Sequence, residues 1–73
     1  MVYKIIFDLG KPYEEIAKDE KDLKKKLKKF YLENRQSGYY YNAEVFFNGE
    51  DISESQFITE MIGGFLEWKN KKF

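Results

Sequence analysis

Apolar and polar residues alternate along two segments of the chain, with the period of two that is typical of a β-strand buried on one face. The first segment runs from Val2 to Leu9. The second runs from Tyr39 to Phe47 and holds five aromatic rings in nine residues. We therefore predict a strand at each segment.

The second of these strands carries aromatic rings on both of its faces. The face that we assign to the core carries Tyr39, Tyr41, Ala43, Val45 and Phe47. The opposite face is polar in its middle and has a ring near each end, in the order Tyr40, Asn42, Glu44 and Phe46. In a chain without His or Cys, such a two-sided strand favours contact with a partner over catalysis.

Gly10-Lys11-Pro12 ends the first strand, because Gly accepts a positive φ and Pro fixes φ and lacks an N–H donor. Residues 13–17 allow two interpretations. They form either a short edge strand with Pro12 at its start, or a helix with Glu14 and Glu15 near the positive end of its dipole. We favour the strand, because a single helix over 12–36 would span about 37 Å, which is long for so small a domain.

Apolar residues spaced by three and four positions predict a helix over residues 20–36. Asp19 is a good N-cap for this helix, and Ser37-Gly38 would end it, because Gly readily adopts the left-handed conformation after the last turn. The stripe consists of Leu23, Leu27, Phe30, Tyr31 and Asn34.

Asn48-Gly49 predicts a tight turn before a second helix. The start of that helix has a complete set of local signals. Ser53 is the predicted N-cap, Gln56 would close a capping box, and Ile52 would pack onto Phe57.

The apolar stripe of the second helix continues across Gly63-Gly64 without a change of phase, as far as Trp68. We therefore extend this helix to about residue 70, although the two glycines cost about 2 kcal/mol of helix stability. In the alternative, the helix ends at Ile62, and residues 65–69 form a last strand.

These elements predict a single small α+β domain over residues 1–73, with the order β-β-α-β-α. We expect a three-stranded sheet of order 2-1-3 with two amphipathic helices packed on one face. The first helix would then connect two parallel outer strands in the usual right-handed sense.

A chain of 73 residues has a marginal core. Without disulfides or a zinc site, dense aromatic packing or oligomerisation must support it.

Charge and composition narrow the possible functions. Thirteen basic and thirteen acidic residues cancel, which argues against neutralisation of phosphate as the main role. Residues 19–37 carry seven basic and four acidic side chains, whereas residues 38–62 carry five acidic and no basic ones.

The absence of Cys and of any long apolar run leads us to expect a cytoplasmic protein without a membrane segment. The composition also suits an AT-rich genome and is common in small accessory proteins of phages and plasmids.

Catalysis is not expected. Without His and Cys, the chain has no ordinary base near pH 7 and no thiol nucleophile. Ser37, Ser53 and Ser55 lie at predicted helix ends, where capping explains them, and the chain has no glycine-rich phosphate loop. We therefore predict no catalytic residue, no metal site, no cofactor and no small-molecule substrate.

The lysine-rich first helix supports nucleic-acid binding as a second hypothesis. Five lysines fall within residues 24–29. At about 100° per residue they point in every direction except that of the apolar stripe, which is typical of an ordinary solvated helix. The candidate nucleic-acid-binding residues are Lys24, Lys25, Lys28, Lys29 and Arg35.

The sheet face opposite the helices is the predicted binding site. It would mix rings, aliphatic side chains and a few charges, as protein interfaces do. The partner would be another protein or a second copy in a homodimer. Alternatively, the second helix or the C-terminal tail covers this face. The predicted protein-binding residues are Ile6, Tyr40, Glu44 and Phe46.

Overall fold

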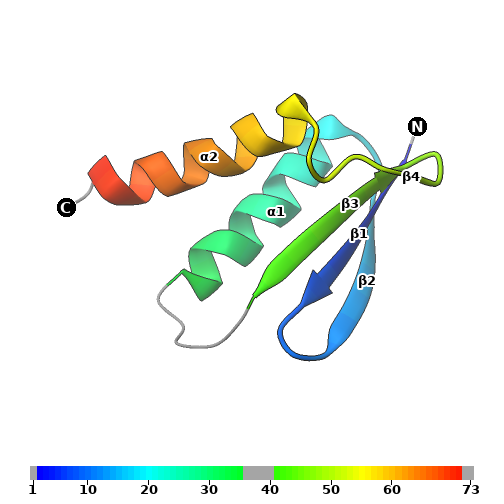
Figure 1. Cartoon of the computed structure of the whole chain (residues 1–73), viewed down its shortest axis with the longest axis horizontal. Coiled ribbons are helices and arrows are strands. Elements are labelled where there is room, and N and C mark those ends of the chain that lie inside the picture. Colours follow the sequence, from blue (N-terminus) through cyan, green and yellow to red (C-terminus); the bar gives the residue numbers. More distant parts are fainter. Residues whose placement is uncertain (1, 36–40, 72–73) are drawn as a thin grey trace.

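The structure is a computed structural model that describes residues 2–35 and 41–71. It confirms a small α+β domain with two helices and an antiparallel sheet (Figure 1). The elements in chain order are β1 (Tyr3–Asp8), β2 (Pro12–Ala17), α1 (Glu20–Asn34), β3 (Asn42–Phe47), β4 (Glu50–Asp51) and α2 (Gln56–Lys71).

The sheet has the strand order β2-β1-β3-β4, and neighbouring strands are antiparallel. The predicted order 2-1-3 matches the first three strands, but the prediction of three strands was wrong. The fourth, β4, follows a turn in which Asn48 and Gly49 both have positive φ, as hairpin turns require. Its two residues are too few and too polar to show the alternation by which a strand is recognised in a sequence.

Residues 13–17 form a strand, so the helical interpretation of this segment was wrong. β2 pairs with β1 from Asp8↔Pro12 to Tyr3↔Ala17. At the turn, Gly10 has a φ of 94°, and its amide donates to Asp8 Oδ1 at 2.8 Å. The left-handed conformation of Gly10 and this local hydrogen bond close the hairpin.

α1 begins as predicted. Asp19 Oδ1 accepts from the Asp22 amide at 2.8 Å, which is the bond expected of an N-cap. Leu23, Leu27 and Phe30 are buried, so the predicted stripe is the face of α1 that packs on the sheet. The helix ends at Asn34 rather than 36, and its predicted cap at Ser37-Gly38 lies outside the described residues.

The predicted start of α2 was wrong. Ser55, not Ser53, occupies the N-cap position: its carbonyl accepts from the Thr59 amide at 2.9 Å. Gln56 donates to Glu60 Oε1 at 2.8 Å instead of closing a capping box. Because α2 continues through Gly63 and Gly64 to Lys71, the alternative with a strand at 65–69 was also wrong.

Both helices contribute to one core. Burial alternates along β1 and β3, so one face of these strands lies under the helices. The rings of Phe7 and Phe30 are 4.5 Å apart between their centroids, and Phe30 also makes an edge contact with Tyr31. The buried core residues are Ile5, Phe7, Ala17, Leu23, Leu27, Phe30, Ala43, Val45, Ile58 and Phe65.

Candidate functional site

The sheet has a second face, which we call the outer face, on the side away from this core. The pairing of the strands places three rows of side chains across it, because directly paired residues project to the same side of a sheet. From β2 through β1 to β3, the rows are Ile16–Lys4–Phe46, Glu14–Ile6–Glu44 and Pro12–Asp8–Asn42.

The side chains of the outer face remain accessible to solvent. Ile16 is 50% exposed, and Val2, next to the start of β1, is 54% exposed. Ile6 and Phe46 are half-buried. The ammonium of Lys4 lies 5.3 Å from the centroid of the Phe46 ring, so a cation–π contact partly shields that ring. The outer face is therefore an open surface with apolar residues at its centre.

Three of the four predicted protein-binding residues come together on this face. Ile6 and Glu44 are directly paired, and Phe46 is the next residue of β3 on the same side. Tyr40 lies outside the described residues. The sequence pattern did not predict that Glu14 and Ile16 of β2 also lie on the outer face. The tight turn at Gly10 could have indicated this, because a hairpin turn fixes which residues of the two strands are paired.

The outer face is acidic around its apolar centre. Asp8, Glu14 and Glu44 lie in the three rows, where Lys4 is the one basic residue and approaches Glu14 to 3.9 Å. Asp51 adds a carboxylate beside Phe46. Hydrogen bonds from the hydroxyl and the amide of Ser53 lower the pKa of Asp51, so this carboxylate stays charged to a lower pH than an ordinary aspartate does.

The free edge of β2 is partly closed. Pro12 has no N–H to offer to another strand. Lys26 Nζ donates to the Ile16 carbonyl at 2.8 Å, and Asp22 Oδ2 accepts from the Lys18 amide at 3.1 Å. Side chains that occupy backbone groups in this way hinder the addition of another strand. The face of the sheet is therefore a better candidate for binding than this edge.

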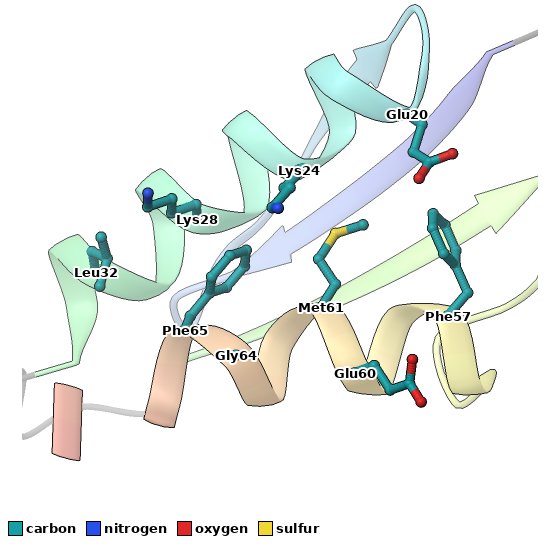
Figure 2. Close-up of a pocket in the computed structure, with 9 residues that line it drawn as sticks. All are labelled: Glu20, Lys24, Lys28, Leu32, Phe57, Glu60, Met61, Gly64 and Phe65. Atoms are coloured by element: carbon teal, nitrogen blue, oxygen red, sulfur yellow. The ribbon is translucent and has the colours of Figure 1, made fainter. Parts of the chain in front are cut away.

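Two grooves run along α1 and take several lining residues from it. The first lies between α1 and α2 and has a volume of about 470 Å³ (Figure 2). The second, of about 540 Å³, lies between α1 and β2. In the second groove Tyr13 is 44% exposed, and its pKa is raised mainly by partial burial, with smaller contributions from Glu15 and Glu33.

The lysines of α1 are divided between these grooves. Lys24 and Lys28 border the groove shared with α2, whereas Lys25 and Lys29 border the groove shared with β2. Arg35, at the C-terminal end of α1, is half-buried. The candidate nucleic-acid-binding residues thus lie on two sides of the helix and not along one stripe.

Comparison of the chain with protein-family models, curated proteins and solved structures found no match.

Over residues 2–35 and 41–71, no cluster of three or more acidic side chains is arranged to hold a metal ion. Within the same ranges, neither helix combines the length and the apolar character needed to cross a membrane.

Proposed function

We propose that this protein acts by stoichiometric binding to another protein through the outer face of its sheet. Ile6 and Phe46 are the anchors at the centre of the contact, and Glu44 lies at its rim. The observation that carries the proposal is an exposed apolar side chain on this face: Ile16, in the row with Lys4 and Phe46, is 50% exposed. Burial of this half-exposed side chain would contribute about 1 kcal/mol.

The charge of the outer face supports a partner with a basic surface. If two copies met through this face, Asp8, Glu14 and Glu44 of one copy would lie against the same carboxylates of the other and repel them. Lys4, the one basic residue in the three rows of each copy, could not balance these charges. Basic residues on the partner would accelerate association and orient the complex more than they would increase its affinity. The proposed partner is therefore a different protein and not a second copy.

No catalytic step is part of this function. The chain lacks His and Cys, the residues that most often transfer protons or attack substrates near neutral pH. A cytoplasmic location fits the absence of Cys, because disulfides accumulate in oxidising compartments.

The test is a crosslinking experiment with a matched control. A photoactivatable phenylalanine analogue replaces Phe46 in one variant and the exposed Leu9, which borders the α1–β2 groove, in the other. In cells of the source organism, we expect a specific crosslinked protein from position 46 and none from position 9.

A substitution series then tests affinity for the crosslinked protein. We expect Ile16→Ala with Phe46→Ala to lower the affinity at least about ten-fold, whereas Leu9→Ala with Tyr13→Ala should leave it unchanged. Circular dichroism confirms that both double variants are folded. Equal crosslinking from both positions, or equal affinity of the two double variants, would refute the proposal.

Nucleic-acid binding through α1 is the second candidate function. The exposure of Lys24, Lys25, Lys28 and Lys29 favours it. Their division between two grooves weakens it, because acidic residues lie beside them in both, with Glu20 and Glu60 in the first groove. We therefore rank it below protein binding.

A further inference from the structure

The groove between α1 and α2 has an apolar floor. Phe57, Met61 and Phe65 follow one another at intervals of four along α2, and Leu32 completes the floor from α1. Figure 2 shows these α2 side chains directed toward α1. Phe57 is 36% exposed and Met61 is half-buried, so the monomer leaves part of this floor open.

The charges at the rim are separated along the groove. Figure 2 shows that both helices run in the same general direction, with Glu20 and Glu60 toward the Phe57 end. Lys24 and Lys28 lie further along, toward Leu32 and Phe65. Among the described residues, the recorded ion pairs are Lys4–Glu14 and Lys26–Asp22, and neither includes these four rim charges. The groove therefore has an acidic end and a basic end.

The described part of the monomer shows no packing need for the glycines of α2. Among the described residues, a Cβ at Gly63 or Gly64 would meet nothing within 4 Å, and Gly64 lines the groove. Each glycine nevertheless costs about 1 kcal/mol of helix stability relative to alanine. A glycine on a helix surface lets another backbone approach closely, which gives Gly64 a role if a further helix lies in the groove.

We propose that two copies of this chain associate through their α1–α2 grooves as a symmetric homodimer. A two-fold axis across the groove reverses its direction in the second copy. Glu20 and Glu60 of each copy then face Lys24 and Lys28 of the other, so the same surface is complementary to itself. Met61 and Gly64 lie in the middle of the contact, where the two α2 helices cross.

The dimer agrees with the other features of the molecule. A domain of this size has a marginal core, and a second apolar contact supports it. Because the described residues that line the groove all belong to α1 and α2, the outer sheet faces of both copies stay free. The dimer would then present two binding faces, which raises the apparent affinity for a repeated or dimeric partner. The proposal itself does not depend on the function of the outer face.

Sedimentation equilibrium of the full chain, from micromolar to millimolar concentration, tests the proposal. We expect a reversible dimer. Gly64→Leu should weaken it at least about ten-fold, because the side chain projects into the contact. In the monomer a Cβ at this position meets no described atom within 4 Å. At concentrations at which the wild type is monomeric, the melting temperature of the variant should therefore not fall below that of the wild type.

Charge reversal gives a test that does not depend on Gly64. Glu20→Lys with Glu60→Lys makes all four rim charges basic, and Lys24→Glu with Lys28→Glu makes all four acidic. Each double variant should be monomeric alone, and an equimolar mixture should form a heterodimer. Glu15→Lys with Glu33→Lys makes the same charge change in the α1–β2 groove and should leave the homodimer intact.

Three results would overturn the proposal. The first is a wild-type chain that stays monomeric throughout the concentration range. This result would overturn the proposal even if another protein were found to bind in the groove. The second is a dimer that Gly64→Leu and the charge reversals do not weaken. The third is a dimer that dissociates on Phe46→Ala, which would move the contact to the outer face. Failure of the dimer leaves the crosslinking test of the outer face unaffected.

Discussion

The hydroxyl of Ser53 lies 2.8 Å from the amide nitrogen of Val45 and accepts its hydrogen bond. Val45 is fully buried in β3, one residue beyond the pairing with β4. The Ile52 amide donates to the Val45 carbonyl at 2.9 Å. Ser53 and Ile52 thus satisfy both backbone groups of Val45 at the edge where β4 ends.

Replacement of Ser53 by alanine should destabilise the fold. The buried Val45 amide would lose its acceptor, and an unsatisfied buried donor costs about 1–3 kcal/mol. Urea denaturation measures this loss as a lower free energy of unfolding. Thr59→Ala, which removes an exposed hydroxyl from α2, should change the free energy by no more than about 0.5 kcal/mol. Equal stability of the two variants would show that another group satisfies Val45.

Asp22 should make stability depend on acid pH. Its pKa is lowered mainly by the hydrogen bond from the Lys18 amide and next by that from the Lys26 side chain. A carboxyl whose pKa is lower in the folded state stabilises it fully above the unfolded pKa of about 4. This contribution is lost as the pH falls through the lower, folded pKa.

The measurement is the free energy of unfolding in urea between neutral pH and about pH 2. Asp22→Asn should be less stable than the wild type at neutral pH and show a shallower loss below about pH 4. Asp51→Asn should behave in the same way, because hydrogen bonds from Ser53 lower the pKa of Asp51. An acid limb that neither substitution changes would contradict both assignments.

Gly63→Ala should stabilise the protein by about 1 kcal/mol, because the position is helical and the added methyl group meets open space. Gly49→Ala is the matched control. Gly49 has a φ of 81°, so alanine at that position should lower the free energy of unfolding. Thermal and urea denaturation compare the two. If Gly63→Ala were destabilising, α2 would not be a regular helix at this position.

A labelled DNA or RNA oligonucleotide tests the second candidate function by fluorescence anisotropy. We expect no saturable binding at low salt, because the lysines of α1 are divided between two grooves that also carry carboxylates. Phosphate binding would instead give an affinity that falls steeply as salt is added. If such binding occurs and is lost in Lys25→Glu with Lys29→Glu, the function lies in α1 and not on the outer face.

Ser53 also shows why sequence reasoning succeeded in some places and failed in others. Its hydroxyl had two possible uses, as the cap of a helix three residues before Gln56 or as an acceptor for the edge of a strand. The helix signal is local and visible in the sequence. The competing bond to Val45 joins residues eight positions apart and exists only after β3 and β4 have paired. The tertiary contact prevailed, and Ser55 took the position before the helix.

The candidate site on the outer face also has a part that the sequence predicted and a part that only the fold reveals. The alternation around Phe46 predicted a face that carries Ile6 and Glu44, and the pairing of β1 with β3 brings them together. The pattern did not reveal that Glu14 and Ile16 lie beside them, because the register of β2 was unknown. The groove with Gly64 was not predicted at all, since it depends on how α2 lies against α1.

The sequence by itself determined β1, the apolar face of α1, the N-cap at Asp19 and the passage of α2 through its glycines. Periodicity and capping act within a few residues of chain, so they can be recognised without the fold. Only the tertiary structure decided the fourth strand, the role of Ser53, the neighbours of Ile6 on the outer face and the charge order of the α1–α2 groove. These features join residues distant in the chain, and their free energy arises only when strands pair and helices pack.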